Sequence, residues 1–341
     1  MNSTDEIFVE QQKIQSYKRV LAITSACCLS LLSIVTTTSN ILLLIAIWKD
    51  PLKCFKSVAK CFIVGLSVAD LITGVTTEPF FTSYYFIRFV QDVDINGIPL
   101  VLYEIGGIIS GVALKYSFLV VLALSWSQFT AISWPHKYRR FVTNRNIVIF
   151  MILAFLYLVL FTAVQFMGIL DPYTFHKIDL VCNSSFLSIN LLIVSLLLYR
   201  AYRRRAHIHK EFSAKPLTSL CENETRAKRR KQVERTLDQQ FTIVSIYLGA
   251  ILLLCALPHV LAVYVYLYFA KDLTIQSQLN LLVALRISDV LLFVKVCADP
   301  FIYAWRLPKY RKTLLTLFRI HKQKKNEEET LVGIPLTERM S

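Results

Sequence analysis

Asp299-Pro300-Phe301-Ile302-Tyr303, followed at once by Ala-Trp-Arg-Leu-Pro-Lys-Tyr-Arg-Lys (304–312), is the stretch of sequence that decides the fold. Its first five residues close a long apolar segment, and the basic residues after them begin a short amphipathic helix. A proline inside a membrane helix frees a backbone carbonyl and kinks the helix, so neighbours or water must satisfy that group. The acid directly before the proline adds a second polar demand at the same depth. We therefore predict a packed, hydrated hinge near one end of a helical bundle.

The composition of the chain agrees with a bundle inside a membrane. The 341 residues are 55% hydrophobic and 18% charged, with a mean hydropathy of +0.51. A soluble core could not hide so much apolar surface. A bilayer requires about 20 apolar residues per helix. Seven segments meet that length, at about 21–48, 57–86, 100–133, 146–169, 182–202, 237–269 and 278–304. They predict an all-α membrane protein, a seven-transmembrane helix bundle.

The positions of the basic residues predict the orientation of the bundle. Lys and Arg concentrate in the loops at 49–60, 136–145 and 200–235 and in the tail from Arg306. The positive-inside rule places these segments in the cytoplasm and the amino terminus outside, as in a multi-pass protein of the plasma membrane. The net charge of +15 is then mainly a topology signal. Contact with anionic membrane lipids is a second interpretation, and no nucleic-acid partner is expected.

The remaining boundaries follow from polarity. We predict an extracellular amino terminus at 1–20, the seven-helix domain at 21–304, an amphipathic eighth helix at 305–319 and a disordered cytoplasmic tail at 320–341. The first 20 residues lack the basic-then-apolar pattern of a cleaved signal, so the first span is predicted to act as the signal anchor. No cysteine follows the amphipathic helix, so a lipid anchor is not expected there.

Glycosylation sequons and cysteines bear on the outer surface. Asn2 and Asn183 begin sequons on the predicted outer side and are expected to be glycosylated, whereas Asn223 begins one in a predicted cytoplasmic loop. Of the eight cysteines, only Cys182 is expected near the outer surface. With no second outer cysteine available, we predict no intrachain extracellular disulfide.

The chain resembles the rhodopsin-like (class A) family of G-protein-coupled receptors from about Leu21 to Phe318. Five motifs in the family's order carry the resemblance: Asn40 in the first span, Leu66-Ser67-Val68-Ala69-Asp70 in the second, Pro135 to Arg140 after the third, Cys255-Ala256-Leu257-Pro258 in the sixth, and Asp299 to Tyr303 in the seventh. Arg306 to Lys312 is similar to the family's eighth, membrane-lying helix. The resemblance implies a receptor that transduces the signal of an extracellular small-molecule or peptide ligand to a heterotrimeric G protein by helix rearrangement. It implies no cofactor and no catalytic residue.

The resemblance also assigns a set of residues to the conformational switch. They are Asn40, Asp70, Gln128, Asp238, Pro258, Lys295, Asp299, Pro300 and Tyr303. Gln128 is a departure, because Ser127-Gln128-Phe129 stands where the family usually has Asp-Arg-Tyr. Asp238 lies where such an arginine would find its partner, and with Gln128 only a neutral hydrogen bond remains, which is weaker than a charge-assisted one. We predict a weak inactive-state latch.

Other departures concern the activation path. Ala256 replaces the usual tryptophan of the sixth span, and Tyr103 replaces the usual outer cysteine of the third. The usual tryptophan of the fourth span and proline of the fifth are not apparent. Packing is distributed over many contacts, so the fold is expected to survive. An atypical receptor that binds a ligand or a partner receptor with weak or no G-protein coupling is therefore kept as the alternative.

Charges within the spans are costly and should face the bundle interior. Asp70 and Asp299 match positions that, in the family, line a pocket for sodium and water. Lys295 stands one helical turn before Asp299, on the same face. Its ammonium group either takes the place of a sodium ion or forms a structural ion pair. A retinal-binding lysine would stand at Phe293, and Lys295 faces nearly the opposite way, so a light receptor is not expected.

Ligand-binding candidates lie nearer the predicted outer end. They are Glu78, Glu104, Ser110, Lys115, Arg286 and Asp289. Ser110 stands where amine receptors carry an aspartate, which disfavours a monoamine. Three of the candidates could form an acidic rim for a basic ligand, and these are Glu78, Glu104 and Asp289. Arg286 and Asp289 could instead satisfy each other, whereas Lys115 has no evident partner and would favour an anionic lipid or a carboxylate. The sign of the ligand stays open.

Competing classes of protein have less support. The basic clusters at 203–205 and 228–231 are interpreted mainly as topology signals, with binding of anionic lipids as the alternative. A membrane enzyme would need a nucleophile or metal cluster, yet His259 is the one histidine well within a span. A transporter would show internal repeats and broken helices, and neither is apparent. We therefore predict a receptor that is not an enzyme and binds no metal, with a transporter the less favoured alternative.

Overall fold

The computed structural model describes residues 3–49, 58–89, 97–213, 222–308 and 310–316. Side chains are described for residues 12–49, 58–89, 97–206, 239–308 and 310–316. The regular secondary structure of these ranges is helical, with no strand. Asn2 and the predicted tail at 320–341 lie outside the described residues, as does the side chain of Asp238. The all-α fold class is confirmed.

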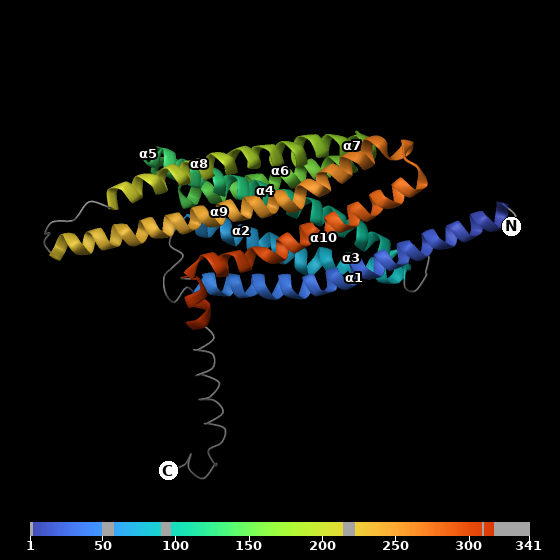
Figure 1. Ribbon diagram of the computed structural model, residues 1–341, viewed down its shortest axis with the longest axis horizontal. Coiled ribbons are helices and arrows are strands. Elements are labelled where there is room, and N and C mark those ends of the chain that lie inside the picture. The colour runs from blue at the N-terminus through green and yellow to red at the C-terminus, as the bar shows by residue number, and fades with distance from the viewer. Residues whose placement is uncertain (1–2, 50–57, 90–96, 214–221, 309, 317–341) are drawn as a thin grey trace, which may run out of the picture.

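The first half of the chain forms four long helical rods (Figure 1). They are α1 (Ser3–Lys49); α2 (Ala59–Ile72), which continues through the π-helical turn η1 (Thr73–Thr77) into α3 (Glu78–Phe89); α4 (Ile98–Ser133); and α6 (Asn144–Ala163), which ends in the 3₁₀ turn η2 (Val164–Phe166). The short helix α5 (Pro135–Phe141) joins α4 to α6. A π turn inserts one residue into a helix and so rotates everything after it.

The second half forms three rods. They are α7 (Pro172–Asp179), which continues through the π turn η3 (Leu180–Ser185) into α8 (Phe186–Ser213); α9 (Glu222–Phe269); and α10 (Ile275–Arg306), preceded by the 3₁₀ turn η4 (Ala270–Asp272). Pro258 lies inside α9 and Pro300 inside α10, where each removes a backbone hydrogen bond. Together with the first half, this makes the seven rods that the sequence predicts.

Six rods in the described residues are long and apolar enough to cross a membrane. They are Gln12–Lys49, Ala59–Phe89, Ile98–Ser133, Asn144–Phe166, Pro172–Ala206 and Gln239–Asp272. The seventh, α10, is 32 residues long but carries Arg286, Asp289, Lys295 and Asp299, which lower its hydropathy. These charges face protein partners rather than lipid, as intramembrane charges should. The chain is a multi-pass membrane protein.

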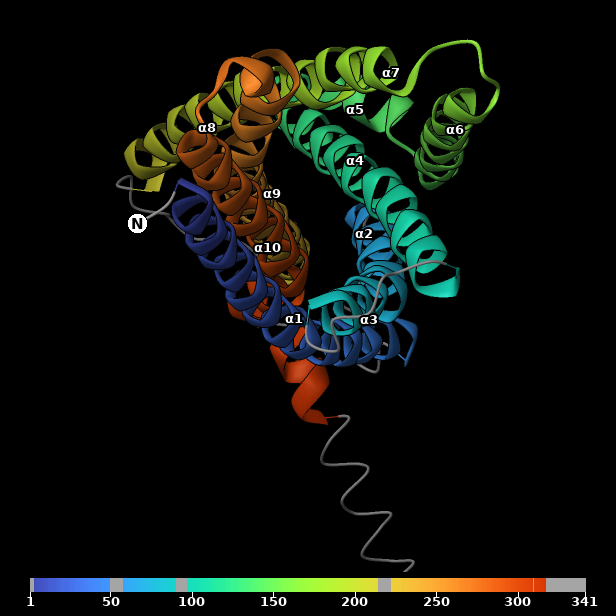
Figure 2. The ribbon, with the colours of Figure 1, turned by 90° about the vertical axis from the view of Figure 1, so that its right-hand side faces the viewer.

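The helices pack side by side around a common core. α9 lies along α10, α1 along α3, and α4 along α8, and the end-on view in Figure 2 shows α6 at the periphery beside α4. The main core cluster includes Leu43, Phe62, Leu66, Leu124 and Tyr303. The outward face of α6 exposes apolar side chains such as those of Ile152, Phe155 and Leu160. Apolar side chains are what a helix surface in contact with lipid requires.

Two predicted span boundaries are wrong at the corner between α6 and α8. The span predicted at 146–169 ends at Phe166, and Gly168 adopts the left-handed φ of 67° that glycine permits. The span predicted at 182–202 begins with α7 at Pro172, because the Asp171 side chain caps the helix by accepting a bond from the Thr174 amide (2.9 Å). This bond also holds the pKa of Asp171 below its usual value. The polar sequence of α7 hid its continuity with the apolar span.

A further helical segment follows α10. Leu307 interrupts the helix, and residues 310–316 are helical again, within the range predicted for the amphipathic eighth helix (Figure 1). Leu307, Tyr310 and Thr313 are buried, whereas Arg311 and Lys312 are exposed. This alternation is the pattern of a helix that lies along a membrane surface with one face packed on the bundle.

Candidate functional site

A pocket of about 520 Å3 lies between α4, α7, α8, α9 and α10. Its floor and walls are mainly apolar, and among them are Phe118, Leu187, Ala256, Val260 and Leu292. The polar side chains of its lining are Lys115, His176, Asp179, Asn183, Ser184, His259, Arg286 and Asp289. An apolar cavity with a few convergent polar groups is typical of a small-molecule site.

One wall of this pocket is a chain of polar contacts between α4 and the rod α7–η3–α8. Lys115 Nζ lies 2.6 Å from Asp179 Oδ2, so the prediction that Lys115 has no partner is wrong. Asn183 Nδ2 donates to Asp179 Oδ1 (2.8 Å), and the Tyr157 hydroxyl donates to Asn183 Oδ1 (3.0 Å). The sequence concealed this partner because Asp179 precedes the predicted start of the fifth span. The π turn η3 begins directly after it and brings Asn183 onto the same side.

The prediction that Asn183 carries a glycan does not fit this arrangement. The Asn183 side chain is 2% exposed, and its Nδ2 is already bound to Asp179. A glycan attaches to an accessible Nδ2 at the surface. The sequon is present, but the Asn183 side chain faces the interior of the bundle.

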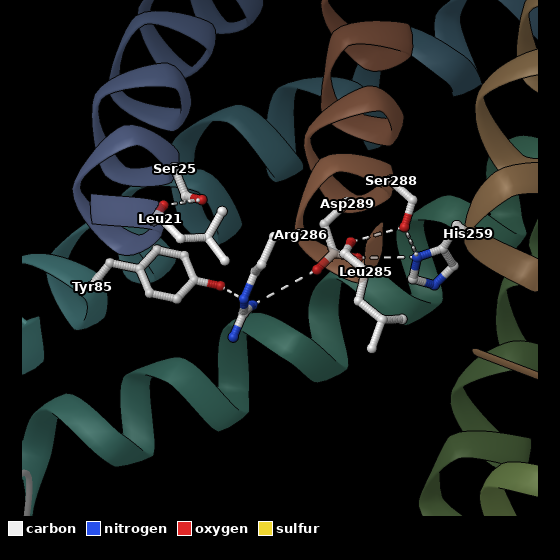
Figure 3. A network of polar contacts seen from close by, with 8 residues as sticks. All are labelled: Leu21, Ser25, Tyr85, His259, Leu285, Arg286, Ser288 and Asp289. Atoms are coloured by element: carbon white, nitrogen blue, oxygen red, sulfur yellow. Dashed lines mark hydrogen bonds and ion pairs between the residues drawn. The ribbon is translucent and has the colours of Figure 1, made fainter. Parts of the chain in front are cut away.

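The opposite wall is the network of Figure 3, which joins α3, α9 and α10. His259 Nδ1 lies 3.0 Å from Asp289 Oδ1, and Arg286 Nη1 lies 3.7 Å from Asp289 Oδ2. Arg286 also donates to the Tyr85 hydroxyl and lies over the Tyr85 ring, 4.8 Å from its centroid. Ser288 Oγ lies 3.3 Å from His259 Nδ1. Asp289 thus contacts side chains of two helices, His259 on α9 and Arg286 on its own helix α10, which goes beyond the mutual pair with Arg286 considered from the sequence.

The remaining ligand candidates do not line this pocket. Glu78 is fully buried elsewhere, with neither carboxylate oxygen hydrogen-bonded within the described part of the chain. Glu104 is exposed, and Ser110 is buried without lining the pocket. The acidic rim of Glu78, Glu104 and Asp289 is therefore not assembled. The π turn η1 immediately precedes Glu78, and its extra residue rotates α3 relative to the α-helical register assumed from the sequence.

Tyr103 takes part in an aromatic cluster next to Arg286. Its ring stacks on that of Tyr84 (4.0 Å between centroids) and lies 5.1 Å from that of Phe81. Phe81 in turn meets Phe293 edge-on at 6.1 Å. Cys182 is exposed and carries a free thiol. Ring packing, rather than a covalent bond, holds the α3 and α4 ends together at Tyr103.

A second polar group lies deeper in the bundle and is called here the polar core: Asp70, Lys295 and Asp299. Asn40 is also buried, and its Nδ2 donates to the Thr36 carbonyl of its own helix (3.0 Å). Lys295 Nζ is 2.8 Å from Asp299 Oδ2, and their side chains are 0% and 1% exposed. Asp70 is close enough to interact electrostatically with both. The ion pair lacks hydrogen-bond geometry, so Lys295 Nζ, Asp70 Oδ2 and both Asp299 oxygens have no hydrogen-bond partner among the described residues. Such atoms are usually satisfied by buried water.

The latch predicted between Gln128 and Asp238 stays a prediction, because the Asp238 side chain lies outside the described residues. Two other hydrogen bonds join α4 to α9 near Gln128. Thr242 Oγ1 donates to Gln128 Oε1 (3.2 Å), and Ser125 and Ser245 share a hydrogen bond (3.0 Å). All four residues are buried, and both contacts are neutral. Thr242 lies one turn after Asp238 and was not among the switch residues predicted from the sequence. Near the end of α10, Arg306 bonds to the Tyr247 hydroxyl and lies over its ring at 4.3 Å.

The described residues contain no group of three or more histidine, cysteine or acidic side chains placed to hold a metal ion. The polar groups of the pocket are instead arranged in contacts between helices, such as Lys115–Asp179 and His259–Asp289. Such links can be exchanged for ligand contacts or rearranged when helices move.

A family model described as "7 transmembrane receptor (rhodopsin family)" matches residues 39–303. No curated protein matches the chain. The match runs from the first rod, directly before Asn40, to Tyr303 in the last, and it includes every motif on which the resemblance rested. The helical rods, the two internal prolines and this match agree, and the chain belongs to the rhodopsin family of seven-transmembrane receptors.

Proposed function

We propose that the chain binds an extracellular ligand in the pocket and passes the signal to a heterotrimeric G protein at the opposite end. The single observation that supports this most is the His259–Asp289 contact of 3.0 Å. It lies in the pocket wall, joins α9 to α10, and directly follows Pro258 inside α9. A ligand that binds Arg286, the other partner of Asp289, acts next to this link between two helices.

The inventory of donors and acceptors in the pocket favours a ligand with an anionic head group. Each oxygen of Asp179 and of Asp289 already contacts a partner. The cations keep spare donors, because an ammonium has three N–H groups and a guanidinium five. A carboxylate or phosphate would use these donors on Lys115 and Arg286 without displacing either acid. The apolar floor would hold an alkyl or aromatic body.

A second cavity supports the same choice. It measures about 540 Å3 and shares Tyr266, Leu282 and Leu285 with the pocket. It is also lined by Lys18 and Lys271, near the predicted outer surface. Both charged residues of its lining are basic. An anionic ligand would therefore meet positive charge along the way into the pocket.

The test compares three ligands with one C18 chain and different head groups. The thermal unfolding midpoint of the purified full chain in nanodiscs is measured with oleate, oleyl alcohol and oleylamine. Oleate should raise the midpoint most. Arg286→Gln should reduce that shift, and Asp289→Asn, which frees Arg286, should increase it. An equal or larger shift with oleylamine would rule out the anionic class.

Coupling to a G protein is the second part of the proposal, and the atypical receptor remains the alternative. Gln128 is neutral and is bound to Thr242, which favours a weak latch and a measurable signal without agonist. Agonist-free nucleotide exchange is compared between wild type and Gln128→Arg at matched surface expression. High wild-type exchange that falls in the variant supports coupling. No agonist-free nucleotide exchange in either the wild type or the variant would favour the atypical receptor.

The orientation is proposed with the amino terminus outside and the tail in the cytoplasm of a plasma-membrane protein. The basic helix α5 and the basic segment after Arg306 support it, because positive charge is retained on the cytoplasmic side. An epitope tag placed before Ser3 should be stained on intact cells, and a tag after Ser341 only after permeabilisation.

A further inference from the structure

A groove separate from the ligand pocket lies where α2, α4, α5 and α6 meet. It measures about 430 Å3 and shares no lining residue with the pocket. Its walls are mainly apolar and include Phe62, Leu119, Leu122, Ala123, Trp126 and Phe150. Its volume falls within the range of about 300–1,000 Å3 that is usual for sites of small molecules. It opens at the end of the bundle where α4 finishes and α6 begins, the predicted cytoplasmic end.

A row of aromatic rings runs from the groove to α5. The Trp126 ring lies 5.7 Å from that of Phe129, which lies 5.6 Å from that of Trp134. Trp126 is 43% exposed and Trp134 50% exposed. Tryptophan with an apolar body and one polar N–H favours the boundary between hydrocarbon and head groups. The row therefore indicates the depth at which the groove meets the membrane surface.

Basic side chains surround the same corner. Lys137, Arg139 and Arg140 on α5 and Arg145 at the start of α6 are exposed. None of the four forms an ion pair with another described residue, and no acidic residue occurs from Trp134 to Asn146. An unopposed group of positive charges at a membrane surface attracts anionic head groups.

The backbone holds this corner in place. Thr143 caps α6 by accepting from the Asn146 amide (3.3 Å), and Asn146 Nδ2 donates to the Phe141 carbonyl (2.8 Å). Asn146 and Phe141 also line the groove. The amino terminus of α6 directs its positive dipole end toward the same place, which adds to the attraction for a phosphate. Apolar walls and anion-binding groups therefore share one site.

We propose that this groove binds one anionic glycerophospholipid of the adjacent leaflet. One acyl chain lies against Ala123 and Trp126, and the phosphate head group lies among Arg139, Arg140 and Arg145. A neutral lipid would leave the basic groups unused, and a soluble anion would leave the apolar walls unfilled. The site shares no lining residue with the ligand pocket.

The experiment uses Trp126 as the reporter. Trp48, Trp134 and Trp305 are replaced by phenylalanine, so that Trp126 is the single tryptophan of the full chain. The protein is placed in phosphatidylcholine nanodiscs that contain the same small fraction of either bromine-labelled phosphatidylglycerol or bromine-labelled phosphatidylcholine. Bromine quenches tryptophan on contact. The anionic lipid should quench Trp126 at least about twofold more, and the excess should fall in 1 M salt, where charges are screened beyond about 3 Å.

Two triple variants with the same loss of charge provide the control. Arg139→Gln/Arg140→Gln/Arg145→Gln should abolish the excess quenching. Arg203→Gln/Arg204→Gln/Arg205→Gln, which removes three arginines from the end of α8, should leave it unchanged. Ala123→Leu should reduce quenching by both lipids, because it fills the groove. Equal quenching by the two lipids, or equal loss in both triple variants, would overturn the proposal.

Discussion

The ligand pocket and the polar core differ in how their charged side chains are buried and paired, although Asp289 and Lys295 are separated by only about 9 Å along α10. In the pocket, the charged side chains are 15–32% exposed, and the Lys115–Asp179 and His259–Asp289 pairs join different helices. In the polar core, Lys295 and Asp299 are sealed, on one helix, and leave polar atoms without a hydrogen bond. Exposed pairs can exchange partners with a ligand at small cost, whereas a sealed pair cannot. The pocket is thus suited to recognition, and the polar core to holding the helices in register.

Removing one cation from each site should give the largest contrast. Lys295→Ala leaves two buried carboxylates without a cation and should cost about 3–5 kcal/mol, enough to lose surface expression. Lys115→Ala should cost about 1 kcal/mol, because Asp179 stays partly exposed and keeps its bond from Asn183. Chemical unfolding of the purified variants measures both. The double variant Lys295→Leu/Asp299→Asn should recover most of the loss, and equal effects of the two single variants would contradict the comparison.

The response to sodium should show whether the Lys295 ammonium occupies the place of a cation in the polar core or only forms a structural ion pair with Asp299. If the Lys295 ammonium takes the place of a cation, the unfolding midpoint of the wild type should not change when sodium replaces N-methylglucamine. Lys295→Leu, which removes the ammonium and keeps the carboxyl groups of Asp70 and Asp299, should gain stability in sodium. The same sodium response in wild type and variant would contradict this role.

The neutral latch should show a smaller effect, on activity rather than stability. Thr242→Val removes the donor to Gln128 and keeps the shape of the side chain. A net hydrogen bond is worth about 1 kcal/mol, which corresponds to an increase of about fivefold in agonist-free nucleotide exchange. Ser277→Ala, at the other end of the bundle, serves as a control for surface expression. Unchanged exchange in Thr242→Val would show that the contact is not a latch.

The smallest expected effect concerns the cap of α7, the helix that positions Asp179. The bond from the Thr174 amide favours the charged form of Asp171 and lowers its pKa. The stabilisation is therefore present above the unfolded-state pKa of about 4 and is lost as the pH falls through the lowered folded-state value. Asp171→Asn keeps a capping oxygen without that charge. Its unfolding midpoint should vary less than that of the wild type between about pH 5 and pH 2.5.

The sequence predicted the family and most of the fold from features that are local in the chain. Apolar segments of membrane length, the internal prolines and the ordered motifs up to Tyr303 need no knowledge of distant contacts. The boundary near Asp171 was missed because a polar helix continues directly into an apolar span, and hydropathy alone detects only the second part. The same error removed Asp179 from the list of candidates.

The site was predicted less well than the fold. Lys115, Arg286 and Asp289 line one pocket, as their common assignment to a ligand site requires. Glu78 and Glu104 do not line it. The π turn η1 rotates Glu78 relative to the register of a regular α-helix, and no residue type in the sequence indicates that turn. Glu104 is exposed on α4. The partners of the candidates were also missed: Tyr85, His259 and Asp179 meet them across helices. Such meetings depend on how whole helices are placed relative to one another.

The sequence by itself determined that this protein is a bundle of membrane helices, because the bilayer requires every backbone group to be satisfied within long apolar helices. Only the tertiary structure decided which charges share a partner. It paired Lys115 with Asp179 and linked His259 to Asp289, although each pair is separated along the chain. The physical reason is that helical periodicity fixes the face of a residue only within its own helix, whereas packing and π turns decide which faces meet.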